Sequence, residues 1–276
     1  MELQGKNIGI IAGGGQFPRL VAQNARKAGA KVFIYGFPEQ TDQGLADDAD
    51  AFEVNNIGQV GKMFKFMKNH QVTHICLAGT IKKTKISDIK PDLYAAKLLF
   101  KLRKNQGDDK LLRTIADHIE SEGFTVVQAA DLVPGLAAPA GVLTRRAPSE
   151  AEMGSIRYGW PIGKGLGAYD IGQCLVIKDR MVVAVEALEG TDAALERGGE
   201  LGGEGCIALK MFKPGQDSRA DLPSIGPKTV EILIKYRYSC LAFEAEKTLF
   251  FDQREALALA DKHGIAIIGV TPKDID

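Results

Sequence analysis

The sequence predicts an α/β protein in which an N-terminal Rossmann-like domain with a parallel sheet precedes a C-terminal α/β domain. Strands and helices alternate through the first half of the chain, as is typical of parallel sheets covered by helices. A stretch rich in proline, glycine and alanine then interrupts the alternation, and a different order of elements follows. We therefore place the N-terminal domain at 1–133, a Pro/Gly/Ala linker at 134–141 and the C-terminal domain at 142–276.

Apolar runs and helical spacing define the elements of the N-terminal domain. The second predicted helix places Val60, Phe64 and Met67 on one face, at the spacing of an amphipathic helix. The run at 74–79 is apolar almost throughout, as expected for a strand that helices cover on both faces. Strands are predicted at 7–12, 31–36, 74–79 and 124–128, and helices at 18–28, 58–69, 92–104 and 108–122.

The C-terminal domain has a different pattern. Two apolar runs at 174–177 and 181–188 are separated by three polar residues, which predicts a hairpin. Residues 198–205 hold five glycines and are predicted to be a mobile loop. The remaining predicted elements are a strand at 206–212, a helix at 226–236, a strand at 249–251, a helix at 253–263 and a strand at 265–270.

Composition narrows the class of protein. Lys+Arg and Asp+Glu are equal at 35 each, whereas a protein that coats DNA would show a basic excess. The four cysteines are far apart and contain no Cys-x-x-Cys pair, which predicts buried, reduced thiols. We find no signal peptide and no apolar run near the about 20 residues of a spanning helix. The sequence therefore predicts a soluble, cytoplasmic protein that does not bind nucleic acid.

The first predicted strand ends in three glycines, Gly13, Gly14 and Gly15, followed by Gln16 and a helical pattern. Glycines let the backbone approach a ligand, and the start of a helix attracts phosphate. A dinucleotide site is disfavoured, because Pro18 replaces the third glycine of that motif and the second strand does not end in an acid. An NAD(P)-dependent sugar-nucleotide oxidoreductase stays an alternative, as does a tight turn without a ligand.

Polar residues follow the strand at 74–79. Gly79, Thr80 and Lys82 come directly after it, where open α/β sheets bind their ligands. Lys82 is placed to meet a phosphate, or else it belongs to a solvated basic loop. Gly107 and Asp108 lie at the start of a predicted helix, where a cap is the alternative to a site.

Carboxylates gather near the end of the strand at 181–188. Glu186 lies within the apolar run, where a charge is costly unless it is paired or bound to a cation. Together with Glu189 and Asp192 it offers the hard oxygen ligands that suit magnesium or manganese. The alternative is that Thr191 or Asp192 caps the next helix.

A second polar segment contains Arg219 and Asp221. Asp221 precedes Leu222 and Pro223, outside the following helix, where its carboxylate is free to bind a metal or position water. Arg219 is a candidate to neutralise phosphate. Residues 222–229 also resemble the turn of a helix-hairpin-helix DNA-binding module, although no clear first helix precedes them. A DNA-binding protein is therefore a further alternative.

Several of these motifs together resemble the LpxI family, the UDP-2,3-diacylglucosamine pyrophosphatases of lipid A biosynthesis. No single motif is diagnostic, but the ordered set spans nearly the whole chain. The matching segments are Gly9–Gly15, Ala78–Gly79, Lys104–Arg113, Asp170–Gln173, Val185–Asp192 and Arg219–Gly226.

The resemblance implies a two-domain, homodimeric enzyme, with catalysis in the C-terminal domain. It would hydrolyse UDP-2,3-diacylglucosamine to lipid X (2,3-diacylglucosamine 1-phosphate) and UMP, assisted by Mg²⁺ or by Mn²⁺ or Co²⁺. Peripheral contact with the inner membrane is also expected. The implied catalytic residues are Asp221 and Arg219, and the implied metal ligands are Asp221, Glu186, Glu189 and Asp192. The implied substrate-binding residues are Gly13, Gly14, Gly15, Gln16, Gly79, Thr80, Lys82, Gly107, Asp108, Gln173, Thr191 and Ile225.

Overall fold

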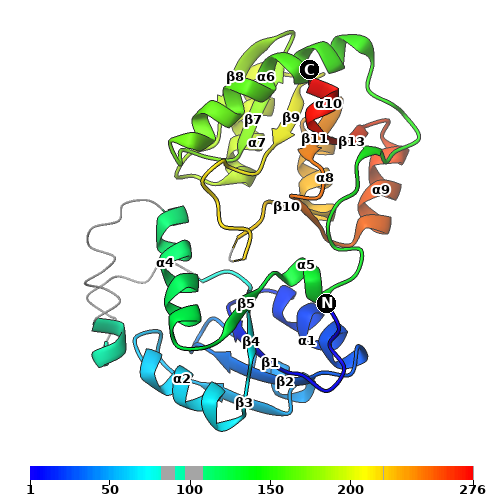
Figure 1. The fold of residues 1–276 in the computed structure, drawn as a ribbon. Coiled ribbons are helices and arrows are strands. Elements are labelled where there is room, and N and C mark those ends of the chain that lie inside the picture. The colour runs from blue at the N-terminus through cyan, green and yellow to red at the C-terminus, as the bar shows by residue number, and fades with distance from the viewer. Residues whose placement is uncertain (82–90, 97–107, 220, 276) are drawn as a thin grey trace. The chain divides into compact units, whose positions relative to one another are not determined.

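The structure is a computed structural model that describes residues 1–81, 91–96, 108–219 and 221–275 (Figure 1). The chain forms two compact units. Unit 1 consists of Met1–Pro134 and Asp217–Asp221, and unit 2 consists of Gly135–Gln216 and Leu222–Asp276. The short segment 217–221 is thus enclosed in sequence by unit 2 but belongs to unit 1 by its contacts.

Unit 1 is built on five parallel strands in the order β3-β2-β1-β4-β5, which confirms the predicted Rossmann-like arrangement. The order reverses between β1 and β4, so the carboxyl edge of these two strands is where such sheets bind ligands. The strands are β1 (Asn7–Ala12), β2 (Lys31–Gly36), β3 (Ala51–Val54), β4 (His74–Ala78) and β5 (Thr125–Val127).

Helices cover both faces of this sheet (Figure 1). Apolar residues of α2 and α4 pack against one face, while α1 and α5 contact each other over the other. The helices are α1 (Phe17–Lys27), η1 (Gln43–Asp48, a 3-10 helix), α2 (Val60–Asn69), α4 (Asp108–Ser121) and α5 (Ala129–Leu132).

Unit 2 contains a mixed six-stranded sheet in the order β6-β13-β11-β9-β7-β8. Strands β9, β11 and β13 are parallel, and β6, β7 and β8 run antiparallel to their neighbours. The strands are β6 (Gly141–Val142), β7 (Cys174–Lys178), β8 (Met181–Val185), β9 (Ile207–Lys210), β11 (Cys240–Glu244) and β13 (Ala266–Val270), and β10 (Ser224–Ile225) pairs separately with β12 (Leu249–Phe250).

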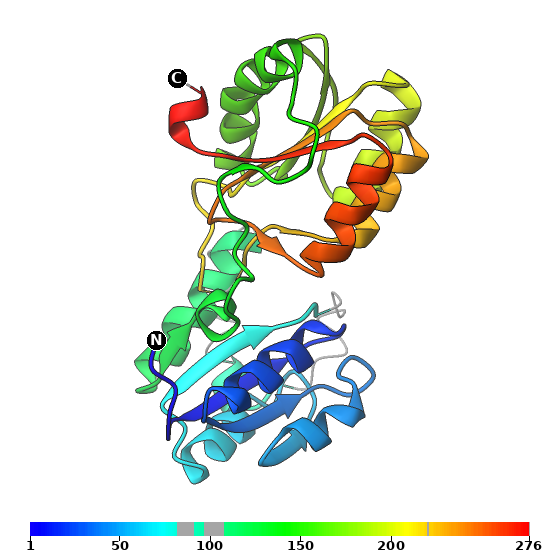
Figure 2. The same cartoon turned by 90° about the vertical axis from the view of Figure 1, so that its right-hand side faces the viewer.

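The two faces of this sheet carry different helices (Figure 2). Ile156 and Trp160 of α6 pack on one face, and residues of α7, α8 and α9 pack on the other. The helices are α6 (Glu150–Ala168), α7 (Thr191–Gly202), α8 (Pro227–Lys235), α9 (Gln253–Lys262) and α10 (Pro272–Ile275). None of the helices in the described ranges is both long and apolar enough to cross a membrane.

The glycine-rich segment 198–205 is largely helical, so its prediction as a loop is wrong. Its first five residues are the last turns of α7, and Gly198 and Gly199 are buried there. A Cβ on Gly198 would lie 2.6 Å from Cγ2 of Val176, which leaves no room for a side chain. These glycines let α7 pack closely on the sheet, and this tertiary contact outweighs their low helix propensity.

The expected linker at 134–141 is part of unit 2 over most of its length. Ala138 donates its N–H to the Thr248 carbonyl at 2.8 Å and accepts from the Glu246 N–H at 2.8 Å. Gly141 lies in strand β6, beside β13. The small residues of this stretch therefore allow the backbone to lie against neighbouring strands, and the boundary between units falls after Pro134.

Candidate functional site

The glycine loop lies at the reversal point of the unit 1 sheet. Gly13 donates its N–H to the Ala78 carbonyl at the end of β4, at 2.8 Å. Gly14 and Thr80 exchange two backbone hydrogen bonds, at 2.8 and 3.1 Å. The loops that leave β1 and β4 are therefore joined, and the structure brings together Gly13, Gly14, Gly79 and Thr80.

The close approach of the two loops explains why positions 13 and 79 are glycines. A Cβ on Gly13 would lie 2.7 Å from the Thr80 carbonyl oxygen, and one on Gly79 would lie 2.6 Å from that of Gly14. Gly15 differs, because it needs a positive φ of 89° but has open space around it. Helix α1 then begins with Gln16 as its N-cap, and the Gln16 side chain makes no cap hydrogen bond. The start of α1 thus keeps the character of an anion site.

Gly13→Ala is expected to separate the two loops, because the added methyl group meets backbone atoms that cannot rotate away. We expect a loss of about 1–3 kcal/mol in the free energy of unfolding, and faster hydrogen exchange at the amides of Gly14 and Thr80. Gly15→Ala is the matched control, since its methyl group meets no neighbour and its strain is confined to φ. Unchanged amide protection in Gly13→Ala would contradict this account.

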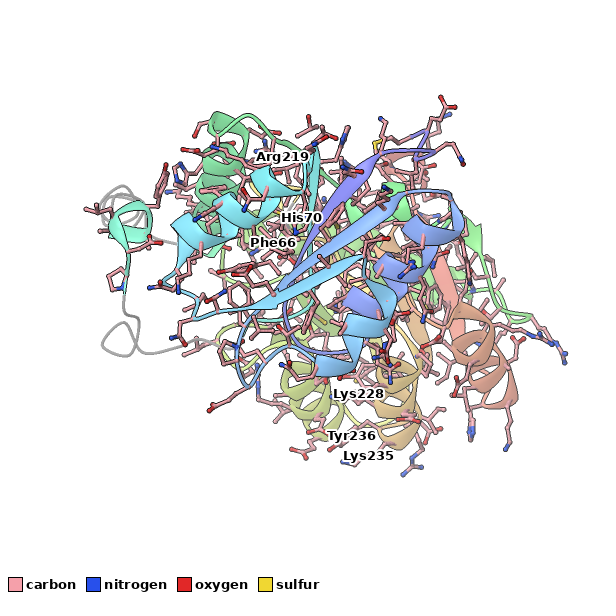
Figure 3. All side chains as sticks on the ribbon, turned by 90° about the horizontal axis from the view of Figure 1, so that it is seen from below. Phe66, His70, Arg219, Lys228, Lys235 and Tyr236 are labelled. Carbon is pink, nitrogen blue, oxygen red and sulfur yellow. The ribbon has the colours of Figure 1, made fainter. Side chains whose placement is uncertain are left out.

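Arg219 is held by three carboxylates of unit 1 and lies beside α4 (Figure 3). Its Nε donates to Asp217 Oδ1 at 3.0 Å, its Nη2 to Asp117 Oδ1 at 2.7 Å and its Nη1 to Glu120 Oε2 at 2.6 Å. Hydrogen bonds to Asp217 and then Asp117 raise the pKa of Arg219, and the bond from Arg219 lowers the pKa of Asp217. The Arg219 guanidinium, which the sequence predicts to neutralise a phosphate, therefore donates hydrogen bonds to three carboxylates.

Asp221 belongs to the same short segment. Its N–H donates to the Asp217 carbonyl at 3.0 Å, which links the two ends of this segment. Ser218 accepts a hydrogen bond from Nε2 of Gln128 at 3.0 Å. The segment that carries Asp221 is thus fixed to unit 1 by side chains from α4 and from the residue before α5.

Two of the predicted residues of unit 2, Gln173 and Thr191, contact the Glu186 carboxylate, and Glu186 is 8% exposed. One Glu186 oxygen accepts from the Gln173 N–H at 3.2 Å, and the other accepts from the Thr191 hydroxyl at 3.0 Å. Thr191 is the first residue of α7. The Glu186 carboxylate therefore joins the residue before strand β7 to the start of α7. Ile225, two residues before α8, is buried in the core of unit 2.

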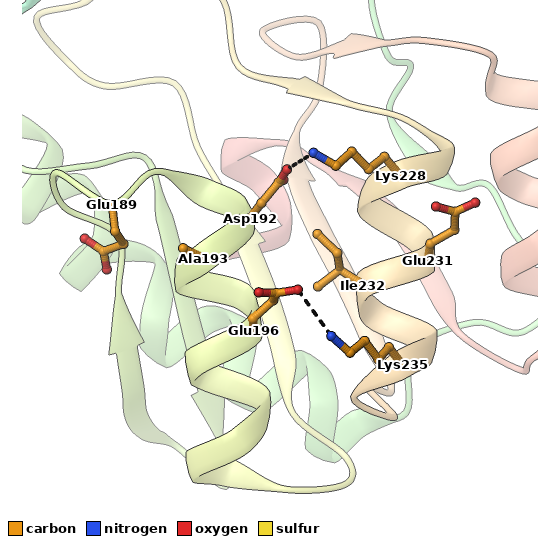
Figure 4. Close-up of a pocket in the computed structure, with 8 residues that line it drawn as sticks. All are labelled: Glu189, Asp192, Ala193, Glu196, Lys228, Glu231, Ile232 and Lys235. Carbon is orange, nitrogen blue, oxygen red and sulfur yellow. Dashed lines mark hydrogen bonds and ion pairs between the residues drawn. The ribbon is translucent and has the colours of Figure 1, made fainter.

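Glu189 and Asp192 line a shallow pocket between α7 and α8 (Figure 4). Glu189 pairs with Arg197 at 2.6 Å, and this hydrogen bond lowers the pKa of Glu189. Asp192 pairs with Lys228 at 2.6 Å, and that bond raises the pKa of Lys228. The two carboxylates are each neutralised by a neighbouring cation.

Within unit 2, the expected metal ligands Glu186, Glu189 and Asp192 each have their own partners. Glu186, Glu189 and Asp192 belong to unit 2 and have the partners given above, whereas Asp221 belongs to unit 1. Among the residues that the structure describes, no three His, Cys, Asp or Glu side chains are placed to hold a metal ion together. The three unit 2 carboxylates therefore do not fit a preformed magnesium site.

Some predicted site residues cannot be placed. Lys82 and Gly107 lie outside the described residues, and Asp108 begins α4 with its side chain not described. The helix-hairpin-helix alternative is wrong, because the described residues between β9 and β10 form turns and extended chain instead of a first helix. Asp117 and Glu120, the partners of Arg219, were not predicted, since nothing in their helical segment marks them.

Comparisons with known proteins cover most of both units. A family model described as the LpxI N-terminal domain matches residues 7–136, and one described as the LpxI C-terminal domain matches residues 139–268. The UDP-2,3-diacylglucosamine pyrophosphatase LpxI of Caulobacter vibrioides is 32% identical over 280 residues, covering 98% of this chain and 99% of its own.

One solved structure is much less similar to this chain. It is the ADP complex of purK, an N5-carboxyaminoimidazole ribonucleotide synthetase. It is 22% identical and covers 56% of this chain and 44% of its own, with a TM-score of 0.23. That score is too low to bear on fold or function.

Proposed function

Because the chain belongs to the LpxI family, we propose that it hydrolyses the diphosphate bond of UDP-2,3-diacylglucosamine in lipid A biosynthesis. Water would add to one phosphorus and the bridging oxygen would leave with the other, giving lipid X and UMP. The observation that carries this proposal is the likeness to a pyrophosphatase over 98% of the chain and both of its units.

The residues of unit 1 suit two parts of this reaction. The joined loops at Gly13–Gly15 and Gly79–Thr80 fix the start of α1 at the carboxyl edge of the sheet. The first turn of α1 can there offer backbone N–H groups to a phosphate of the nucleotide. Asp221, carried by the same unit, offers a carboxylate that can orient the attacking water or accept its proton. We assign the bond-breaking role to Asp221 and give Arg219 the role of holding its segment.

We also propose that Mg²⁺, or Mn²⁺ or Co²⁺ in its place, assists the reaction, because a divalent cation offsets the charge that a diphosphate carries as its bond breaks. A homodimer and peripheral contact with the inner membrane are part of the proposal, the latter because a substrate with two acyl chains stays in a bilayer.

The test is hydrolysis of UDP-2,3-diacylglucosamine by the purified full-length chain, with both products identified by mass spectrometry. We expect equal amounts of lipid X and UMP, and no turnover of UDP-N-acetylglucosamine, which lacks the acyl chains. Absence of UMP release would overturn the proposed activity. Excess EDTA is expected to stop the reaction until Mg²⁺ is added back. Full activity in EDTA would contradict the proposed metal assistance but not the proposed hydrolysis.

A further inference from the structure

A groove of unit 2 lies between α9 and the residues that follow β6, the strand at one edge of the six-stranded sheet. Its volume is about 430 Å³. Leu143 and Arg145 line one side of it, and residues 254–262 of α9, drawn in orange-red in Figure 2, line the other. We call it the α9 groove. None of the residues predicted from the sequence to bind substrate or metal lines it.

Helix α9 turns one face to the core and a different face to the groove. Ala256 and Ala260 are fully buried in the core of unit 2. Arg254, Ala258 and Lys262 follow one another at intervals of four residues, so they form one stripe along the helix, and all three are exposed. This stripe therefore places a small apolar residue between two cations on the surface of the molecule.

The floor of the groove is apolar. Leu143 and Leu257 are partly buried and pack against the core of unit 2 from the two sides of the groove. Ala258 lies on the exposed stripe beside them. The long stems of arginine and lysine can extend over such a floor while their charged ends stay in a polar layer.

The charges of the α9 groove are not balanced. Asp261 is the single acid among its described lining residues, and it contacts Arg145, whose Nε lies 3.6 Å from Asp261 Oδ2 and whose side chain is 91% exposed. Arg254 and Lys262 have no hydrogen-bond or ion-pair partner among the residues that the structure describes. Three cations against one acid leave two positive charges in excess, although Lys+Arg and Asp+Glu are equal over the whole chain.

The pocket between α7 and α8 shows the opposite pattern in the same unit. There Lys228 pairs with Asp192 and Lys235 with Glu196, so each exposed lysine has its own countercharge (Figure 4). Arg146, which follows Arg145 in the chain, is also satisfied, because Glu152 accepts two of its hydrogen bonds. The excess of positive charge is therefore a local property of the α9 groove, and it calls for an anionic partner.

We propose that the α9 groove docks unit 2 on the surface of an anionic bilayer. Arg145, Arg254 and Lys262 contact lipid phosphates, while Leu257 and Ala258 face the boundary between headgroups and acyl chains. The choice of a bilayer rests on the proposed function, because a substrate with two acyl chains stays in a membrane. Clustered arginine and lysine side chains beside an apolar strip have the composition of an anionic lipid-binding surface.

The test is flotation of the full-length chain, without substrate, with vesicles of two compositions. One is pure phosphatidylcholine, and the other contains equal parts of phosphatidylcholine and phosphatidylglycerol. We expect wild type to float with the anionic vesicles and to be released from them as salt screens the attraction. Failure to bind the anionic vesicles, or equal binding to both compositions, overturns the proposed docking surface.

Substitution of the two unpaired cations locates the surface. The double variant Arg254→Gln/Lys262→Gln should bind anionic vesicles about 25-fold more weakly, since each cation near such a surface strengthens binding about fivefold. The matched control is Lys235→Gln/Arg237→Gln, which removes the same charge from exposed positions at the end of α8. It should bind almost as wild type does. Equal losses in the two double variants would indicate attraction by net charge alone and overturn the role of the groove.

A single position inside the groove gives a second, independent comparison. Ala258→Glu places a negative charge between Arg254 and Lys262, and Ala258→Gln adds a side chain of nearly the same shape without the charge. Both residues suit a helix, and Ala258 is exposed, so both variants should fold with the Tm of wild type. We expect Ala258→Glu to lose binding to anionic vesicles and Ala258→Gln to keep most of it. Equal binding by the two variants overturns the proposed surface.

Other occupants of the groove give different results. An acidic peptide is tested by the fluorescence anisotropy of labelled polyglutamate, and a second copy of the chain by sedimentation velocity. Tight binding of polyglutamate without binding to vesicles, or dissociation of a dimer by Ala258→Glu but not by Ala258→Gln, assigns the groove to that partner and overturns docking on lipid.

Hydrolysis separates this docking surface from the proposed function. Arg254→Gln/Lys262→Gln should hydrolyse UDP-2,3-diacylglucosamine as wild type does when detergent disperses the substrate, and more slowly when the substrate is embedded in anionic vesicles. Turnover by wild type that is the same in both forms for the double variant leaves the proposed function in place and removes the docking surface. Vesicle binding that depends on the groove, without any turnover, removes only the proposed function.

Discussion

Asp221→Asn is expected to reduce kcat by about 10²–10⁴-fold while the protein still binds its substrate. The amide has nearly the shape of the carboxylate but neither its charge nor its basicity. The backbone hydrogen bond from Asp221 to Asp217 does not involve the replaced group, so the turn is retained. Turnover is measured by UMP release, and binding by calorimetry with the inactive variant.

Asp131→Asn is the matched control, since Asp131 is an exposed aspartate of α5 in the same unit. It should have wild-type activity. Two readouts separate the roles of Asp221. Partial recovery of Asp221→Asn at high Mg²⁺ indicates a metal ligand, and loss of the acidic limb of the pH–rate profile indicates a base. Normal turnover by Asp221→Asn would show that the bond-breaking group lies elsewhere.

Arg219→Gln should reduce both stability and activity, because it leaves Asp217, Asp117 and Glu120 without their common cation. The Arg219 and Asp217 side chains are 26% and 9% exposed, whereas those of Asp117 and Glu120 are 59% and 39% exposed. Solvent therefore screens part of the network, and we expect a loss of about 1–3 kcal/mol in the free energy of unfolding. A displaced Asp221 should lower kcat by about 10–100-fold.

A positioning role predicts a particular pattern of rescue. Adding Asp117→Asn and Glu120→Gln to Arg219→Gln removes the repulsion between unpaired carboxylates, so stability should recover while kcat does not. Arg237→Gln is the control, because Arg237 makes a single surface pair with Glu204 at 3.1 Å. If Arg219→Gln loses substrate affinity but keeps kcat, the arginine contacts the substrate directly and the positioning role is wrong.

Local pattern was sufficient to predict four of the five strands of unit 1, although not β3, and it was insufficient for much of unit 2. Strands β1 and β2 are short, apolar and almost wholly buried, so their sequence alone identifies them. Helix α6 was not predicted because Pro161 and five glycines lower its helix propensity. Gly159 of α6 packs where a Cβ would lie 2.6 Å from Cδ1 of Leu209, so only the folded sheet explains that glycine.

The candidate site was predicted in the same uneven way. The glycine loop follows from one continuous motif, and its position at the edge of a parallel sheet follows from the strand order. The partners of Arg219 could not be predicted, because Asp117 and Glu120 are 102 and 99 residues away in sequence.

Residues 217–221 belong to unit 1 although unit 2 precedes and follows them in sequence. Cleaving the chain at one position therefore cannot separate the two units completely. The chain crosses between the units after Pro134, after Gln216 and again after Asp221. A fragment that ends at Pro134 would lack Arg219 and leave the acids of α4 unneutralised, and the complementary fragment would carry Asp221 on a segment without its support. We therefore expect the two fragments together to restore activity only if residues 217–221 of the second fragment bind to unit 1.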